Sequence, residues 1–187
     1  MKTNRILTGL AALLLLISGC IPSLHPLYTD EDIVFEKTLL GAWGNDEEIW
    51  TFSTDDSVSY DLTIIYEEDT SYFEVHMVIL NDHYFIDFYP ANNDHLDIPG
   101  HLALNLLAVH TFARISFDKK ELQVRHFEPR WLDSLFEQNR IRIKHEVLDD
   151  GSIVLTAPTD ELQKFVSKYA NDPNALTKAD TYNKFLH

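Results

Sequence analysis

Short runs in which apolar and polar residues alternate strictly constrain this chain more than any other feature. The clearest run spans residues 58–66 and puts its apolar side chains on one face of an extended backbone, the period of a half-buried β-strand. A helix would place them three and four residues apart. We therefore expect a mainly β domain. The residues that share this face are Val58, Tyr60, Leu62, Ile64 and Tyr66.

Similar runs follow one another along the chain, separated by polar turns such as Asn81-Asp82 and Asp149-Asp150-Gly151. One longer loop, from Asn92 to Gly100, interrupts the series. The pattern predicts about eight strands, mostly joined as hairpins. They cover residues 49–52, 58–66, 73–79, 83–89, 102–117, 122–126, 141–147 and 153–157.

Helical periodicity is confined to the last third of the chain. Pro129 can open a helix before the last hairpin, because proline is tolerated in a first turn, and apolar residues from Trp131 to Phe136 share one face. Thr159 is expected to cap a second helix whose apolar stripe is Leu162, Phe165, Val166 and Tyr169. The sequence also suggests a weaker final helix from Asn174 to Phe185, so one or two C-terminal helices are expected.

This order of elements suits an antiparallel up-and-down barrel or a strongly curled sheet of about eight strands. Gly41-Ala42-Trp43 resembles the Gly-x-Trp motif at the start of lipocalin-like domains. The resemblance implies that the tryptophan closes the base of the barrel and that the glycine admits a tight backbone path. The helix around Trp131 departs from the lipocalin pattern. We assign residues 39–187 to this lipocalin-like domain.

The first residues have the three parts of a secretory signal: basic Lys2 and Arg5, an apolar run from Ile6 to Ile17, and small residues before Cys20. The run is shorter than the roughly 20 apolar residues of a spanning helix. Leu16-Ile17-Ser18-Gly19-Cys20 resembles the lipobox of bacterial lipoproteins. That resemblance implies removal of residues 1–19 and attachment of diacylglycerol to the cysteine, with an acylated, palmitate-type amino terminus.

Cys20 is the only cysteine in the chain, so no disulfide can form within it. A free thiol is a liability outside the cytoplasm, whereas a lipidated one is consumed. Two or more acyl chains give durable membrane binding. We therefore expect Cys20 to be a membrane anchor and not a nucleophile.

Residues 20–38 are expected to be the lipidated N-terminus and tether, since Pro22 and Pro26 keep the chain extended. In enteric lipoproteins an aspartate directly after the cysteine favours the inner membrane. Here that position is Ile21, so the family rule points to the outer membrane. No acidic run of the kind that sends some lipoproteins to the cell surface directly follows the cysteine, so we expect the periplasmic face. The stretches 22–29 and 110–114 also resemble bacterial lipoproteins, a likeness that brings no activity with it.

The mature chain is strongly acidic. Removal of residues 1–19 takes away two basic residues, which leaves 13 basic and 30 acidic residues and a formal charge of −17 over 168 residues. Such a surface repels nucleic acid, because each phosphate contact needs Lys or Arg. A nucleic-acid partner is therefore excluded.

Nothing in the sequence supports catalysis, a metal or another cofactor. The nine histidines lack helical metal-ligand spacing, and His76, His83, His110, His126 and His145 fall on separate expected strands. His110 interrupts an apolar strand, for which a buried histidine with a hydrogen-bond partner is the common explanation. The serines lack a nucleophile-elbow context, and there is no Gly-rich phosphate loop.

Two classes of function remain open. As a binding module, the barrel would hold an apolar or lipid-like small molecule among aromatic side chains. As a non-catalytic structural or interaction protein, it would fill its own interior and meet an envelope protein through its outer surface. The expected ligand-binding residues are Trp50, Tyr60, Tyr66, Phe73, Met77 and Phe85.

Overall fold

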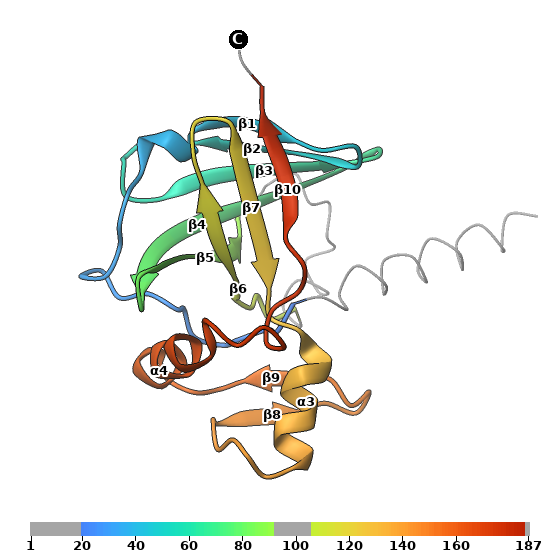
Figure 1. Ribbon diagram of the computed structural model, residues 1–187. Coiled ribbons are helices and arrows are strands. Elements are labelled where there is room, and N and C mark those ends of the chain that lie inside the picture. Colours follow the sequence, from blue (N-terminus) through green and yellow to red (C-terminus); the bar gives the residue numbers. More distant parts are fainter. Residues whose placement is uncertain (1–19, 92–105, 186–187) are drawn as a thin grey trace, which may run out of the picture.

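A closed antiparallel barrel of eight strands is the centre of the molecule (Figure 1). The computed structural model describes residues 20–91 and 106–185. Of the two architectures that the alternation allows, the structure has the barrel. Its strands, in spatial order, are β1 (Gly41–Gly44), β10 (Asp180–Lys184), β7 (Glu121–His126), β6 (Thr111–Phe117), β5 (His83–Pro90), β4 (Asp69–Leu80), β3 (Tyr60–Tyr66) and β2 (Glu48–Ser53).

The barrel is a meander that is closed by its last strand. Strands β1 to β7 pair with their sequence neighbours, and β10 then lies between β7 and β1. The expectation of a final helix from Asn174 to Phe185 is wrong, because β10 occupies this region. Tyr182 pairs with Leu122 of β7, and Lys184 pairs with Trp43 of β1. Without β10, the backbone groups of β1 and β7 would be left as open sheet edges.

Two apolar clusters form on opposite sides of the barrel wall. On β5, Ile86 and Phe88 belong to the inner cluster, whereas Phe85 points outward into the other. The inner cluster contains Leu39, Trp43, Trp50, Phe52, Tyr60, Leu62, Val75, Met77, Ile86, Phe88, Ala113, Ile115, Leu122, Val124 and Tyr182.

Gly41 and Trp43 behave as the lipocalin resemblance implies, although they lie within β1 and not before the first strand. Gly41 has a φ of 111°, a region that residues with a side chain rarely adopt. The Trp43 ring is fully buried and its Nε1 donates to the carbonyl oxygen of Leu39 at 2.7 Å. The ammonium of Lys184 lies 4.5 Å from the Trp43 ring centroid and donates to Thr38. This end of the barrel is thus closed by β1 and β10 together.

The segment between β7 and β10 forms a unit attached to the outside of the barrel. It consists of α3 (Pro129–Glu137), the hairpin of β8 (His145–Val147) and β9 (Ile153–Leu155), and α4 (Thr159–Tyr169). As expected, Pro129 lies in the first turn of α3. Thr159 does not cap α4: Pro158 is the N-cap, and Thr159 Oγ1 instead donates to the carbonyl oxygen of Pro26 at 2.8 Å.

The attached unit covers the outer apolar cluster. Leu162, Phe165 and Val166 of α4 are buried together with Val78 of β4 and Phe85 of β5. The strands of the hairpin are shorter than expected, and residues 141–143 precede β8. Strand β6 begins at Thr111, so the expected earlier start is wrong for residues 106–109, which form no strand. Residues 102–105 of the expected strand lie outside the described residues, as do residues 1–19 and the loop from Asn92 to Gly100.

Candidate functional site

The six expected ligand-binding side chains do not face one space. Trp50, Tyr60 and Met77 belong to the inner cluster and are buried, and Phe73 packs against them. Tyr66, the last residue of β3, is partly exposed and lies in neither cluster. The placement of Phe85 among the barrel-lining residues is wrong. Its neighbour Ile86 points inward, so Phe85 must point outward, where its ring stacks 6.4 Å from that of Phe127.

The interior aromatic rings contact one another. The centroid of the Trp50 ring lies 5.1 Å from that of Tyr182 and 5.7 Å from that of Phe88. Phe52 lies 6.0 Å from Tyr60 in an edge-to-face arrangement. These are the separations of directly packed aromatic pairs. At this level the described side chains therefore fill the barrel themselves.

Most polar groups at the margins of this interior have partners. The Tyr60 hydroxyl accepts the N–H of Glu36 at 2.7 Å, and burial raises the pKa of Tyr60 to about 12. The Tyr182 hydroxyl donates to Glu48 Oε1. Burial, followed by this carboxylate, raises the pKa of Tyr182. Both phenols are therefore held protonated, which suits donors in a structural network better than acid–base groups.

Trp50 is the exception. Its Nε1 is buried and has no hydrogen-bond acceptor within the described part of the chain. A buried N–H without a partner costs about 1–3 kcal/mol, and such groups often mark a bound water or ligand. Trp50 is therefore the one interior position where a polar atom of a small molecule would satisfy a described donor.

The chain that follows Cys20 is extended, as its prolines suggest, but it is not a free tether. Residues Cys20–Tyr28, which we call the anchor segment, pack on the domain. Ile21, Ser23 and Leu27 are buried. Ser23 exchanges two backbone hydrogen bonds of 2.8 Å with His110. The flexible spacer expected after Cys20 is therefore not observed. Burial of the apolar side chains of Ile21 and Leu27 is more favourable than their exposure to water.

The anchor segment also ties the attached unit to the barrel. The N–H of Leu24 donates to Leu155 of β9, and the N–H of Leu155 donates to Pro22, each at 2.9 Å. Ser23 therefore lies between β9 on one side and His110, at the start of β6, on the other. Gln163 of α4 adds a hydrogen bond to the carbonyl oxygen of Leu27. The segment acts as a connecting strand between the two parts.

The Cys20 thiol lies 3.4 Å from Nδ1 of His126, at the end of β7. A cysteine and a histidine at this distance can form a nucleophilic pair only if the thiol ionises. Here burial raises the pKa of Cys20 to about 11 and lowers the pKa of His126. Both groups are therefore neutral near pH 7, and the pair does not have the charge state of an activated nucleophile.

A buried polar cluster holds the other end of the anchor segment. Asp87 of β5 is 1% exposed, and its Oδ1 lies 2.7 Å from Nδ1 of His110. Its Oδ2 accepts the N–H of Leu27 at 2.7 Å. The Tyr28 ring stacks on His76, with 4.0 Å between centroids. Burial raises the pKa of Asp87 and lowers that of His76.

This cluster gives His110 the hydrogen-bond partner that the sequence suggests. The sequence analysis did not single out Asp87. A carboxylate within the apolar strand expected at residues 83–89 could have indicated it, because an acidic residue is rarely buried without a partner. Both oxygens of Asp87 have hydrogen-bond partners within the domain. The cluster therefore attaches the anchor segment to the barrel. Over the residues with described positions, no three His, Cys, Asp or Glu side chains converge as metal ligands.

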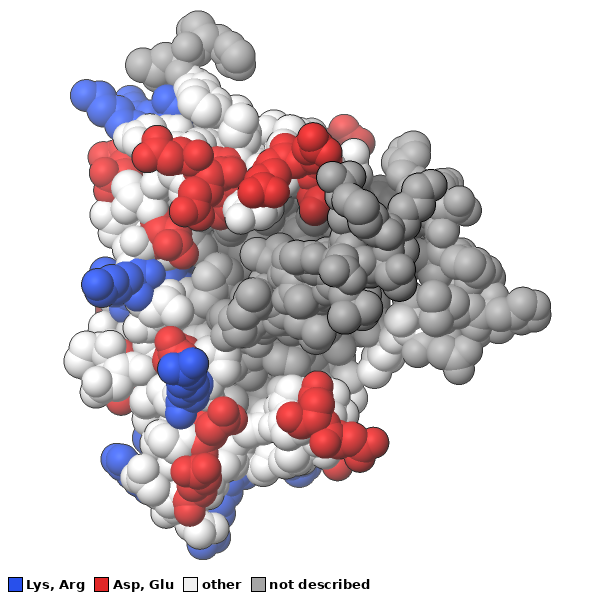
Figure 2. All heavy atoms as spheres, turned by 90° about the vertical axis from the view of Figure 1, so that its right-hand side faces the viewer, with Lys and Arg blue, Asp and Glu red and all other residues white. Residues whose placement is uncertain are grey.

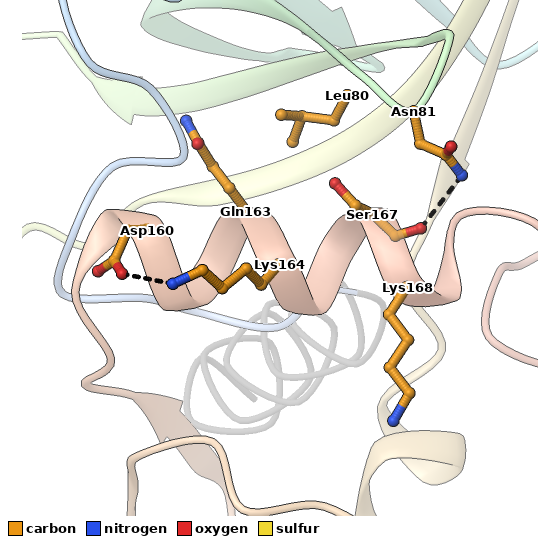
Figure 3. A pocket seen from close by; sticks show the side chains of 7 residues that line it. All are labelled: Leu80, Asn81, Asp160, Gln163, Lys164, Ser167 and Lys168. Atoms are coloured by element: carbon orange, nitrogen blue, oxygen red, sulfur yellow. Dashed lines mark hydrogen bonds and ion pairs between the residues drawn. The ribbon is translucent and has the colours of Figure 1, made fainter.

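Two surface hollows flank α4. The larger has a volume of about 520 Å³ and is open to solvent (Figure 3). In it, Asn81 donates to the carbonyl oxygen of Ser167 at 3.3 Å, and Lys164 pairs with Asp160 at 2.8 Å. The smaller, of about 230 Å³, is floored by Ile143, Phe165 and neighbouring apolar residues. Neither combines a nucleophile with an oriented base, so neither has the geometry of a catalytic site.

Charge is distributed unevenly over the described surface. Residues 29–91, which include β1 to β5, carry 16 acidic side chains and a single basic one, Lys37. Figure 2 shows one face of the molecule on which acidic groups gather toward the upper end. The attached unit supplies basic groups such as Arg142, Lys144 and Lys168. The barrel is thus the acidic part of the molecule.

Among the described residues, no helix is both long and apolar enough to span a bilayer. Comparison with known proteins adds no assignment. No protein-family model matches this sequence, and no curated protein or solved structure shows significant similarity to it.

Proposed function

We propose that this chain is a lipid-anchored protein of the bacterial cell envelope, in which a packed barrel serves as a non-catalytic scaffold that meets an envelope protein through its outer surface. The observation that carries the scaffold role is the interior, where Trp50, Phe88 and Tyr182 pack against one another. An eight-stranded barrel is just wide enough to be filled by its own side chains. A filled barrel leaves the outer surface as the place of interaction.

The membrane anchor rests on the lipobox-like sequence before Cys20, and the neutral state of its thiol is compatible with it. Burial raises the pKa of this cysteine, so the folded domain does not use it as a nucleophile. Lipidation consumes the thiol before the domain matures. Ile21 after the cysteine favours the outer membrane, and the lack of an acidic run directly after the cysteine favours its periplasmic face.

Metabolic labelling tests the anchor. In a Gram-negative host, the wild-type chain should incorporate a palmitate analogue and fractionate with membranes. Cys20→Ser should do neither and should accumulate as a soluble or unprocessed form. Serine is close in shape to cysteine, so this change leaves the rest of the domain intact. Equal labelling of the two forms would contradict the proposal.

Site-specific cross-linking tests the protein partner. A photoreactive side chain at exposed Lys168, between the two hollows, should give a discrete adduct in cells that carry the lipidated form. The same side chain at exposed Asp61, on β3, is the matched control. An adduct that also forms with Cys20→Ser would show an encounter independent of the membrane. Absence of any adduct from exposed positions around the whole barrel would contradict the scaffold role.

One observation favours binding of an apolar or lipid-like ligand as a second candidate function. The unpartnered Nε1 of Trp50 could donate to a carboxylate or ester oxygen of such a molecule. Titration with a fatty acid or lysolipid would then change tryptophan fluorescence saturably at low micromolar ligand, about 8 kcal/mol of binding free energy. The scaffold role predicts no saturable change.

A further inference from the structure

Three exposed leucines stand out beside the anchor segment. Leu107 is 72% exposed, the highest value among the large apolar side chains of the described chain, and Leu106 is 55% exposed. Leu24, within the anchor segment, is 38% exposed. Single exposed leucines are ordinary on protein surfaces, whereas a group of them at one place marks an interaction surface.

Chain connectivity limits the distance between these leucines and Cys20. Ser23 and His110 exchange two backbone hydrogen bonds, so they lie directly opposite each other. Leu24 follows Ser23, and Leu107 precedes His110 by three residues, a span of at most about 10 Å. Cys20 precedes Ser23 by the same number of residues. With about 5 Å between Ser23 and His110, all three leucines lie within about 30 Å of the Cys20 backbone.

The anchor segment provides no flexible spacer between this surface and the lipid. Ile21, the residue next to Cys20, is 4% exposed, and Ser23 is fully buried. A lipid attached to Cys20 begins at the level of the headgroups. The surface next to the anchor must then lie at that level as well, because a docked segment cannot lift the domain away.

We propose that Leu24, Leu106 and Leu107 form a membrane-contact surface that inserts into the headgroup region of the bilayer that holds Cys20. The proposal rests on the lipid anchor of the proposed function. A bilayer fits this surface because Leu24 belongs to the docked segment that starts at the point of lipid attachment, and Leu107 lies three residues from His110, which pairs with that segment. Apolar side chains at the headgroup boundary bury themselves about 5–10 Å deep, as in amphipathic interfacial segments.

The lipidated full chain provides the test, because lipid on Cys20 leaves no other native thiol to react. Leu107→Cys then carries the single free thiol, to which an environment-sensitive NBD fluorophore is attached. The protein is reconstituted into vesicles of phosphatidylethanolamine and phosphatidylglycerol, with or without a lipid that is spin-labelled near its headgroup. Leu106→Cys provides a second, independent position.

Val58→Cys is the matched control. Val58 is an exposed apolar residue, at 48%, in the turn between β2 and β3. The antiparallel order puts this turn at the end of the barrel where β7 begins, whereas Cys20 lies beside His126, where β7 ends. Its label should stay in water when the leucine positions enter lipid.

We expect the spin-labelled lipid to quench the Leu107 and Leu106 labels roughly twofold or more and to leave the Val58 label unchanged. Co-flotation with vesicles is measured in the same samples. Flotation without quenching at either leucine position overturns the membrane-contact surface and leaves the anchor standing. Failure of the wild type to float overturns the anchor, and the membrane-contact surface with it.

Discussion

The carboxylate of Asp87 lies 2.7 Å from Nδ1 of His110, inside a domain whose other buried side chains are almost all apolar. The same carboxylate accepts the N–H of Leu27 from the anchor segment. A carboxylate that is buried with two hydrogen-bond partners is stable, but removal of either side leaves an unpaired polar group. The pair therefore fastens the anchor segment to β5 and β6.

Replacement of Asp87 by alanine should lower the free energy of unfolding by about 3–5 kcal/mol, because His110 and the N–H of Leu27 would both lose their acceptor in a buried place. Urea denaturation measures this loss. Faster hydrogen exchange at the Leu27 amide would show that the anchor segment has loosened. Asp61→Ala, at an exposed position of β3, should change stability by less than about 0.5 kcal/mol. Equal losses would contradict the fastening role.

Stability should decrease as the pH falls below the ordinary histidine value. Burial lowers the pKa of His126 in the folded state from 6.5, while the unfolded chain keeps the ordinary value. Between these two values the unfolded state binds a proton that the folded state excludes, so the free energy of unfolding drops with falling pH. The stabilising contribution of neutral His126 is fully present above pH 6.5. It is lost as the pH falls from 6.5 to the lowered pKa of His126 in the folded state.

The drop in stability between pH 7.5 and pH 5.5, measured by urea denaturation, should be smaller in His126→Gln than in the wild type. Asp87, whose pKa is raised, acts in the opposite direction, since its protonated form favours folding at low pH. Because Asp87 is present in both the wild type and His126→Gln, its contribution cancels when the two proteins are compared. His83→Gln is the control and should follow the wild type, because its partly exposed ring lies beside Asn171 at the surface. An unchanged drop in His126→Gln would contradict the assignment.

Local periodicity predicted most of the barrel because each strand exposes one face to the interior. The run at 58–66 became β3, and the runs at 49–52, 83–89 and 122–126 became β2, β5 and β7. The same reasoning failed at residues 174–185. Strand β10 has one buried apolar residue, Tyr182, and owes its conformation to backbone pairing with β7 and β1. Such long-range pairing leaves little trace in local sequence.

The candidate site was harder to predict, because it depends on which face of each strand points inward. Phe85 and Ile86 are both buried, one on each side of the wall, so hydrophobicity alone cannot assign them. The anchor segment contains prolines typical of a linker. Its docking depends on Asp87, which lies 60 residues after its partner Leu27, and on His110, which lies still further along the chain. Neither relationship is visible before the chain is folded.

Docking of α4 should contribute strongly to stability through Phe165. Its ring packs against Phe127 and Trp131, with centroids 5.9 and 6.1 Å away. Phe165→Ala should lower the free energy of unfolding by about 3–5 kcal/mol through lost burial and a cavity. Lys164→Ala removes only an exposed pair with Asp160 and should cost less than about 0.5 kcal/mol. Similar values for both variants would show that α4 does not dock on the outer cluster.

Two interior tryptophans differ in one hydrogen bond, which allows a matched measurement. Trp43 and Trp50 are both buried, but only Nε1 of Trp43 has an acceptor, the carbonyl oxygen of Leu39. A change to phenylalanine removes the same atoms at each position. Trp43→Phe also strands the Leu39 carbonyl, whereas Trp50→Phe removes a donor that has no partner. Trp43→Phe should therefore be more destabilising than Trp50→Phe, by about 1–3 kcal/mol in urea denaturation.

This comparison also separates the two candidate functions. If the barrel is packed by its own side chains, the difference between the variants should persist in protein that has been unfolded, freed of small molecules and refolded. If Trp50 donates to a copurifying ligand, Trp50→Phe and Trp43→Phe should lower the free energy of unfolding by similar amounts in the protein as isolated. The two variants should differ in stability only after the small molecules have been removed. Equal costs both before and after delipidation would contradict the unpartnered state of Trp50 Nε1, and would place a permanently bound water or side chain beside it.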